Sequence, residues 1–289
     1  RSCCAGQRRE LKRNILSTEG SAELGRGTRA GLSPSNPALQ ALRRLSRRRS
    51  ARTESGTFLI DGPVLLAEAL AAGTPLRAVY VEPAGVGTDA IRLARSTGVD
   101  VHEVQSGALA KVLDLASPQA VVAVADIVAV DPSEVLGAAV ASGRPVLVLV
   151  ELQDPGNAGT LIRVAEAAGC AGVVLTERSV DVHNPKVVRA TAGALLRLPV
   201  AEGANATELL SAASAAGVPS WATVKDGGTS LDDAALVGAC LLVVGSEAHG
   251  LPGDGVAAAT CGLTIPMDGT VESLNAAVAA SILMWEMWT

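Results

Sequence analysis

The sequence predicts an α/β protein with two domains, each built from short apolar strands that alternate with helices. The chain of 289 residues is 48% hydrophobic, which is enough for more than one buried core. Valine and leucine runs such as 145–150 lack the polar alternation of a half-exposed strand, and this is typical of parallel strands covered on both faces. Stretches with helical periodicity lie between these runs. We therefore expect a parallel sheet flanked by helices.

Composition divides the chain into four segments. Residues 1–32, rich in Gly, Ser and Arg, are expected to be a disordered arm or to lie upstream of the native start. Residues 33–127 are expected to form a small α/β domain, 128–144 a linker that is helical in part, and 145–289 the second domain. Strands are predicted at 58–60, 78–81, 101–104, 120–125, 145–150, 172–175, 219–224, 240–244 and 262–265. Helices are predicted at 63–72, 89–96, 106–115, 158–168, 185–196, 207–216 and 273–288.

Positive charge is concentrated in the N-terminal 60 residues. Residues 1–60 hold 13 Lys and Arg against 4 Asp and Glu, whereas residues 61–289 hold 11 against 25. Leu39, Leu42 and Leu45 indicate a short docked helix beneath the basic run. Such a run either binds a polyanion through its phosphates or forms a solvated helical face. The run itself consists of Arg43, Arg44, Arg47, Arg48, Arg49 and Arg52.

Several protein classes are not supported. The longest apolar stretches are far shorter than the roughly 20 residues of a membrane-spanning helix. Five cysteines form an odd set without a C-x-x-C pair, and the three histidines lack ligand spacing, so neither a disulfide framework nor a metal site is expected. The first residues lack the pattern of a secretory signal. We expect a protein of a reducing, cytoplasmic compartment, without metal or membrane partner.

Three loops that follow predicted strands are the places to look for chemistry, because open α/β sheets bind ligands beyond the carboxyl ends of their strands. In the first loop, 151–163, Asn157 is placed to cap a helix and Arg163 lies about two turns inside it. Taken alone, these two residues are better explained as a simple helix cap and a surface charge than as functional groups.

The second loop, 245–252, carries Gly245 and Gly250, which allow close backbone approach, and the carboxylate of Glu247. It matches neither a Walker A loop nor G-x-G-x-x-G, so a nucleoside triphosphate or a nicotinamide is not indicated. The third loop, 265–275, places Ser273 and Asn275 at a helix start, where free N–H groups gather. The apolar stripe of the following helix indicates core or a subunit interface, and consists of Leu274, Val278, Ile282 and Trp285.

Together and in this order, the loops resemble the three motifs of the SpoU (TrmH-type) branch of the SPOUT superfamily of RNA 2′-O-methyltransferases. The resemblance runs from Pro145 to the C-terminus. The motifs are N-x-G-x-x-x-R from Asn157, G-S-E-x-x-G-L from Gly245 and I-P-M-x-G-x-x-x-S-L-N from Ile265. Residues 36–125 are similar to the ribosomal-protein-like substrate-binding domain that precedes the catalytic domain in many members.

The resemblance implies a trefoil-knotted C-terminal domain that binds S-adenosylmethionine and dimerises through knot helices, where Trp285 and Trp288 would suit the interface. It implies that Arg163 acts on the target ribose or its phosphate. Asn157, Ser273 and Asn275 would orient ribose and arginine, and Glu247 would hold the active-site loop or a facing subunit. Cofactor contacts are implied for Gly245, Ile265 and Leu274, with Thr223 and Met267 as further candidates.

The nucleic-acid partner is expected to be a structured RNA. Asn184 and Pro185 start a helix that places Lys186 and Arg189 on one face, either as phosphate contacts or as a solvated face. With five aromatic residues in all, the chain is better suited to read RNA shape and phosphates than to stack on bases, which favours ribosomal over transfer RNA. Two rivals to the enzyme remain: a non-catalytic RNA-binding or ribosome-assembly factor on the same fold, and a small-molecule enzyme with a basic tail.

Overall fold

The computed structural model describes residues 31–114, 117–234, 236–246, 250–251, 258–267 and 273–288. The chain divides into two compact units. The first unit contains the residues up to Ile127 together with His183–Arg189, and the second contains Val128–Val182 and Ala190–Thr289. The expected arm falls on residues 1–32, of which 1–30 lie outside the described residues. Each unit is described by itself below.

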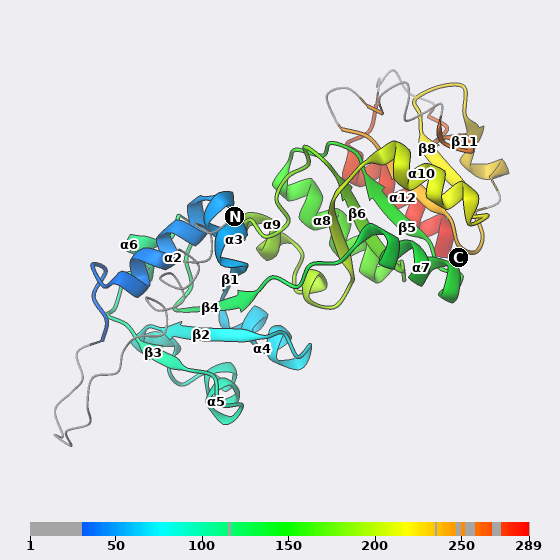
Figure 1. Cartoon of the computed structure of the whole chain (residues 1–289). Coiled ribbons are helices and arrows are strands. Elements are labelled where there is room, and N and C mark those ends of the chain that lie inside the picture. The colour runs from blue at the N-terminus through cyan, green and yellow to red at the C-terminus, as the bar shows by residue number, and fades with distance from the viewer. Residues whose placement is uncertain are drawn as a thin grey trace, which may run out of the picture. The chain divides into compact units, whose positions relative to one another are not determined.

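The first unit is a four-stranded mixed sheet with helices, in the order β1-β4-β2-β3. β1 (Thr57–Asp61) and β2 (Leu76–Val81) both pair antiparallel with β4 (Val121–Asp126), and β3 (Val101–Glu103) pairs parallel with β2. Two of the described helices precede β1 along the chain, and three lie in the connections between the strands (Figure 1). They are α2 (Pro37–Arg47), α3 (Arg49–Ser55), α4 (Pro63–Ala71), α5 (Asp89–Ser96) and α6 (Ala108–Val112), with a 3-10 turn at η1 (Pro83–Gly85).

α2 docks on the first sheet through the leucines that the sequence indicated. Asn36 caps the helix by accepting a hydrogen bond from the Ala38 N–H, 2.9 Å away. Leu39, Leu42 and Leu45 are at most 4% exposed and pack in one cluster with strand residues such as Leu59 and Val124. The expected docked helix is confirmed, and it carries the first three arginines of the basic run, Arg43, Arg44 and Arg47, on its exposed side.

The second unit is built on a sheet of seven strands among the described residues, all paired parallel, in the order β7-β6-β5-β10-β8-β11-β9. The predicted strands are present as β5 (Val146–Leu149), β6 (Gly172–Thr176), β8 (Ser220–Thr223), β10 (Leu241–Val244) and β11 (Cys261–Thr264). β7 (Val200–Ala204) and β9 (Thr229–Ser230) were not predicted. β7 contains Glu202 and Gly203, and β9 is two residues long, so neither shows an apolar run.

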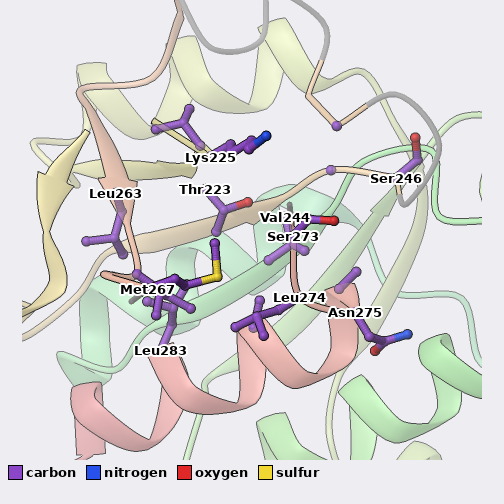
Figure 2. A pocket seen from close by; sticks show the side chains of 16 residues that line it. Thr223, Lys225, Val244, Ser246, Leu263, Met267, Ser273, Leu274, Asn275 and Leu283 are labelled. Atoms are coloured by element: carbon purple, nitrogen blue, oxygen red, sulfur yellow. The ribbon is translucent and has the colours of Figure 1, made fainter. Parts of the chain in front are cut away.

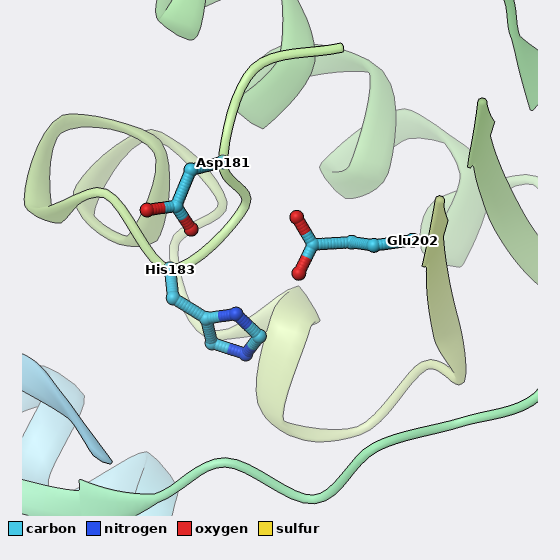
Figure 3. Close-up of side chains that lie close together, drawn as sticks. All are labelled: Asp181, His183 and Glu202. Atoms are coloured by element: carbon cyan, nitrogen blue, oxygen red, sulfur yellow. The ribbon is translucent and has the colours of Figure 1, made fainter. Parts of the chain in front are cut away.

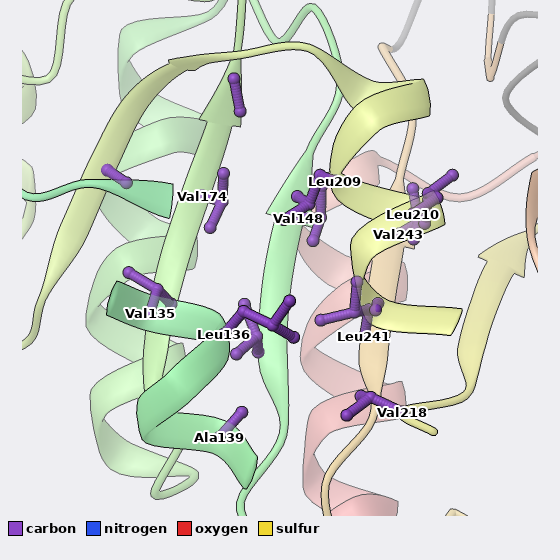
Figure 4. Close-up of a cluster of buried hydrophobic side chains, with 14 of the residues drawn as sticks. Val135, Leu136, Ala139, Val148, Val174, Leu209, Leu210, Val218, Leu241 and Val243 are labelled. Carbon is purple, nitrogen blue, oxygen red and sulfur yellow. The ribbon is translucent and has the colours of Figure 1, made fainter. Parts of the chain in front are cut away.

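Helices cover both faces of this sheet, which is why its central strands are apolar on both sides. α7 (Pro132–Ser142) and α10 (Ala206–Ala215) pack on one face, where a buried valine and leucine cluster joins them to the strands (Figure 4). α8 (Pro155–Ala167) and α12 (Ala276–Trp288) pack against each other (Figure 1). Two further short elements are η2 (Ala194–Leu196) and η3 (Leu231–Asp233). None of the described helices is both long and apolar enough to cross a bilayer.

Two predicted segments differ from the structure. The stretch expected to be a linker contains the expected helix, α7, but its Val135 and Ala139 are fully buried in the second unit's core, so the segment is part of that unit. The predicted helix 185–196 ends early, so that α9 covers Pro185–Ala190 and a turn separates it from η2. Ala192 and Gly193 both have positive φ, at 49° and 95°, which a continuing α-helix does not allow.

Arg189 belongs to the first unit and pairs there with Asp61. Its guanidinium donates to the Asp61 carboxylate and to the Ser117 carbonyl oxygen, the latter at 3.0 Å. The Asp61 side chain is 3% exposed, and its other oxygen accepts from the Gln119 N–H at 3.1 Å. Arg189, expected as an RNA phosphate contact, is therefore engaged in holding a buried carboxylate at the end of β1.

Replacing Arg189 tests this role. We expect Arg189→Ala to destabilise the first unit by about 1–3 kcal/mol, because a buried Asp61 charge loses its partner while Arg189 itself is one-third exposed. Hydrogen exchange of the β1 and β4 amides, read by mass spectrometry, measures the loss. Lys186→Ala, which removes an exposed cation of the same helix, is the control. Equal protection in the two variants would show that the pair contributes nothing.

Candidate functional site

The three loops singled out in the sequence lie at one edge of the second sheet. β5, β10, β8 and β11 are consecutive neighbours and run parallel, so their carboxyl ends share that edge. Loop 151–163 follows β5, loop 245–252 follows β10, and loop 265–275 follows β11. β8, between the last two, ends at Thr223. The parallel register thus brings together stretches that are far apart in sequence.

A pocket of about 510 Å³ opens at this edge and is drawn in Figure 2. All five predicted cofactor contacts line it: Thr223, Gly245, Ile265, Met267 and Leu274. Ser273 and Asn275, predicted as ribose-orienting residues, line it as well. The sequence interpretation missed Lys225, Ser246 and the apolar lining residues Leu263 and Leu283. Contact of these residues with a bound ligand stays a prediction.

The loop after β10 closes through a backbone pair that leaves no room for a side chain at Gly245. The Ser246 N–H donates to the Gly250 carbonyl at 3.1 Å, and the Gly250 N–H donates back at 2.9 Å. A Cβ atom on Gly245 would lie 2.2 Å from the Gly250 carbonyl carbon, well inside contact distance. Glycine at this position therefore lets two backbone segments meet at the pocket wall. Glu247 lies outside the described residues.

The first loop is anchored before it becomes a helix. Glu151, directly after the strand region of β5, has φ 50°, a value that is uncommon for a residue with a side chain. Its N–H donates to the Thr176 hydroxyl at 3.0 Å, and its carboxylate pairs with Arg178. The Val180 N–H donates to the Leu152 carbonyl at 2.7 Å. These contacts tie the loop to the end of β6 and to the segment that follows it.

The cap of α8 is Asp154, which corrects the expectation that Asn157 caps this helix. The Asp154 carboxylate accepts from the Asn157 N–H at 2.7 Å, and Pro155 begins the helix. The Asn157 side chain instead reaches the neighbouring helix. Asn275 donates through Nδ2 to Asn157 Oδ1 at 3.4 Å and accepts from the Ala277 N–H at 2.9 Å.

Asn275 therefore caps α12, which begins at Ala276 rather than at the predicted residue 273, and also joins α12 to α8. Arg163 lies two turns into α8 on an exposed position and forms no ion pair or hydrogen bond through its side chain within the described part of the chain. It is not a lining residue of the pocket, but it stands on the helix that Asn157 ties to the pocket wall. A guanidinium in this place can bind an incoming anion.

Two cysteines of this unit are poor candidates for nucleophiles. Burial raises the pKa of the Cys170 thiol to about 12 and that of the Cys240 thiol to about 11. Both thiols therefore stay protonated at neutral pH, where only a thiolate would attack a substrate. A covalent cysteine intermediate at these two positions is not supported.

A group of acidic and imidazole side chains lies elsewhere, after β6. Figure 3 shows Asp181, His183 and Glu202, and the Val182 N–H donates to the Glu202 carboxylate at 3.3 Å. Asp181 and Glu202 belong to the second unit, whereas His183 belongs to the first. We assign no metal site to a group divided in this way.

The basic run is split by the structure. Arg43, Arg44 and Arg48 are exposed and form no ion pair among the described residues, whereas Arg47 lies 3.6 Å from an Asp114 carboxylate oxygen. Arg49 is also exposed. Arg52 is 3% exposed and donates to the Leu45 carbonyl, so it is corrected from a surface contact to a residue that joins α3 to α2.

This fold and site define a class: a parallel α/β domain whose ligand pocket is closed by the loops after three neighbouring strands, with a separate small domain before it. The sequence profile of the SpoU rRNA Methylase family matches residues 144–285, and that of the MRM3-like substrate binding domain matches residues 36–123. A 23S rRNA (guanosine(2553)-2′-O)-methyltransferase, RlmP, of Bacillus subtilis (strain 168) is 32% identical over 238 residues, which are 82% of this chain and 90% of RlmP. The chain belongs to the SpoU rRNA methylase family.

Solved structures of related proteins share the fold. An AdoMet-bound rRNA methyltransferase from Sinorhizobium meliloti is 28% identical with a TM-score of 0.79, over 89% of this chain and 95% of that one. The SpoU methyltransferase AviRb from Streptomyces viridochromogenes, in complex with AdoMet, is 27% identical with a TM-score of 0.76, over 86% of this chain and 96% of that one.

Gly245→Ala tests the closure of the pocket wall. The added methyl group overlaps the Gly250 backbone, so we expect the loop to open and the midpoint of thermal unfolding to fall. Gly137→Ala in α7 is the matched control, because a Cβ there meets no atom within 4 Å and alanine favours a helix. A Gly245→Ala variant as stable as the wild type would contradict the close backbone approach.

Proposed function

We propose that this chain transfers a methyl group from S-adenosylmethionine to a ribose 2′-hydroxyl of ribosomal RNA. The observation that carries the proposal is the pocket lined by loops 245–252 and 265–275, to which the first loop is joined by the hydrogen bond between Asn275 and Asn157, with Arg163 further along the same helix as Asn157. The AdoMet-bound relatives and the 2′-O-methyltransferase RlmP support the same reaction. A non-catalytic RNA-binding or assembly factor on this fold is the alternative, and it would not bind the methyl donor.

The residues of the pocket fit S-adenosylmethionine. Apolar side chains such as Leu263, Met267 and Leu283 suit an adenosine moiety. Gly245 has no side chain, so the backbone itself forms this part of the pocket wall and its polar groups can face a ligand. Thr223, Gly245, Ile265, Met267 and Leu274 would hold it. When bound, the cofactor supplies an electrophilic methyl group on a sulfonium.

The protein's own residues align the acceptor oxygen with that methyl group. A guanidinium is a poor base. Arg163 therefore acts by binding the phosphate next to the target ribose and by polarising the 2′-hydroxyl of that ribose. Asn157, Ser273 and Asn275 orient the ribose at the start of α12. Glu247, outside the described residues, is proposed to hold the active-site loop.

Arg163→Ala separates binding from turnover. We expect it to leave the dissociation constant for S-adenosylmethionine unchanged, because Arg163 does not line the pocket, and to lower turnover at least about a hundredfold. Calorimetry and methylation of rRNA transcripts measure the two quantities. Arg144→Ala removes another exposed arginine of the second unit as a control. Normal turnover in Arg163→Ala would remove this residue from its role, and a wild type unable to bind the donor would favour the alternative.

The first unit is proposed to bind the RNA through the exposed part of its basic run. Phe58 and Tyr80, the aromatic residues of its described part, are at most 3% exposed and offer no stacking surface. Recognition there rests on phosphates, and Lys186 is a further candidate. This mode suits a folded ribosomal element better than a linear strand, with transfer RNA as the second choice.

Replacing Arg43, Arg44 and Arg48 together by alanine tests this surface. We expect weaker RNA binding. The slope of log affinity against log salt concentration should become shallower by about 0.7–0.9 for each phosphate that the variant no longer neutralises. A filter-binding titration at several salt concentrations gives both values.

A triple variant with the same change in charge is the control. It replaces arginines of the first unit that each pair with a carboxylate: Arg77, Arg92 and Arg95. If both triple variants show the same fall in affinity and in salt dependence, only net charge matters and the surface is not specific.

Assembly and topology complete the proposal. Val278, Ile282 and Trp285 of α12 are between 39% and 62% exposed and form one apolar stripe, which supports a homodimer through this helix. The Trp288 side chain lies outside the described residues. Family membership supports a trefoil knot in the second unit and a place in the cytoplasm, where ribosomal RNA is found.

A further inference from the structure

The pocket has a positive charge at its wall. Lys225 follows β8 and is the one charged residue among the described lining residues. Figure 2 shows its side chain on the same side of the pocket as Thr223, with the ammonium nitrogen at its tip. The apolar lining residues Leu263, Met267 and Leu283 lie below it in that view. The pocket therefore has a cationic part and an apolar part.

The sequence around Lys225 makes this charge unusual. Residues 198–289 contain one lysine or arginine, which is Lys225, against ten aspartates and glutamates. An acidic region repels anions in general. A lone ammonium group at the pocket is thus the place in this region where a negatively charged group could be held.

Lys225 is also unengaged as far as the described part of the chain shows. Its side chain is exposed, and within the described residues it forms no salt bridge or hydrogen bond. The arginines of the same unit that serve the fold are paired, as Arg197 is with Glu166 and Arg178 with Glu151. A structural role in the fold therefore does not account for the position of Lys225.

We propose that Lys225 binds the carboxylate of the methionine moiety of S-adenosylmethionine and so sets the direction in which the cofactor lies. The inference rests on the proposed use of this cofactor. S-adenosylmethionine carries one carboxylate and two cationic groups, the sulfonium and the ammonium. Lys225 attracts the first and repels the other two, while the uncharged adenosine prefers the apolar part. Lys225 is a positioning residue, since it acts at a distance from the transferred methyl group.

Two ligands that differ in the amino-acid tail provide the test. S-adenosylhomocysteine has the carboxylate, whereas 5′-methylthioadenosine shares the thioadenosine part and lacks the tail. We expect Lys225→Met, which keeps most of the length of the side chain, to weaken S-adenosylhomocysteine binding about threefold to tenfold and to leave 5′-methylthioadenosine binding unchanged. Calorimetry of the full chain at low salt measures both affinities.

Further variants sharpen the result. Lys225→Glu is expected to weaken S-adenosylhomocysteine binding more than Lys225→Met does, because repulsion replaces attraction. Lys111→Met, which removes an exposed lysine of the first unit, is the control and should change neither affinity. Added salt should weaken S-adenosylhomocysteine binding to the wild type more than to Lys225→Met.

Three outcomes would overturn the proposal. Equally weakened binding of the two ligands would place Lys225 at the nucleoside, and unchanged binding of both would show that it does not touch the cofactor. Weaker RNA binding with normal S-adenosylhomocysteine binding would make it a phosphate contact instead. Failure of the wild type to bind S-adenosylhomocysteine at all would count against the proposed function rather than against the place of Lys225.

Discussion

Parallel pairing of β5, β10, β8 and β11 is the constraint from which the site follows. Each of these strands ends at the same edge, so the loops behind them must meet there whatever their distance in sequence. Helices cover both faces of the sheet, so the side chains on both faces of a central strand are buried. Val148 and its neighbour Leu149, which point to opposite faces, are an example. The pocket is thus lined largely by loops that a rigid, doubly covered sheet holds in place.

Charge is separated between the two units in a way that matches two different tasks. The first unit carries exposed arginines on α2 and near the start of α3, where a polyanion would be held by counterion release. The second unit is acidic, and several of its cations are either paired, as in Arg178 and Arg197, or exposed, as in Arg163 on α8 and Lys225 at the pocket. An acidic catalytic unit discourages unspecific binding of RNA and leaves a small number of cations to select where an anion binds.

The sequence predicted the central strands and the three loops because both have strong local signals. Valine and leucine runs indicate covered strands, and glycine, proline and asparagine mark the turns behind them. β7 and β9 were missed because edge strands need few apolar residues, and helix 185–196 was overextended because Ala192 gives no local sign of a positive φ. In the sequence alone, Arg52 and Arg189 look like surface cations. Their burial and pairing depend on Leu45 and Asp61, which tertiary structure alone brings near.

The capping of α8 and α12 shows how helix ends can place reactive groups. Asp154 provides the cap of α8, so the Asn157 side chain is not needed there and accepts from the amide of Asn275. Asn275 in turn binds the first N–H groups of α12 with its oxygen. One short chain of hydrogen bonds therefore joins the two helix starts, with Arg163 further along one helix and Leu274 just before the other. Positioning of this kind needs no strained side chain. The backbone N–H groups at the start of any helix need hydrogen-bond partners, and the side chains that cap them here also position the helices.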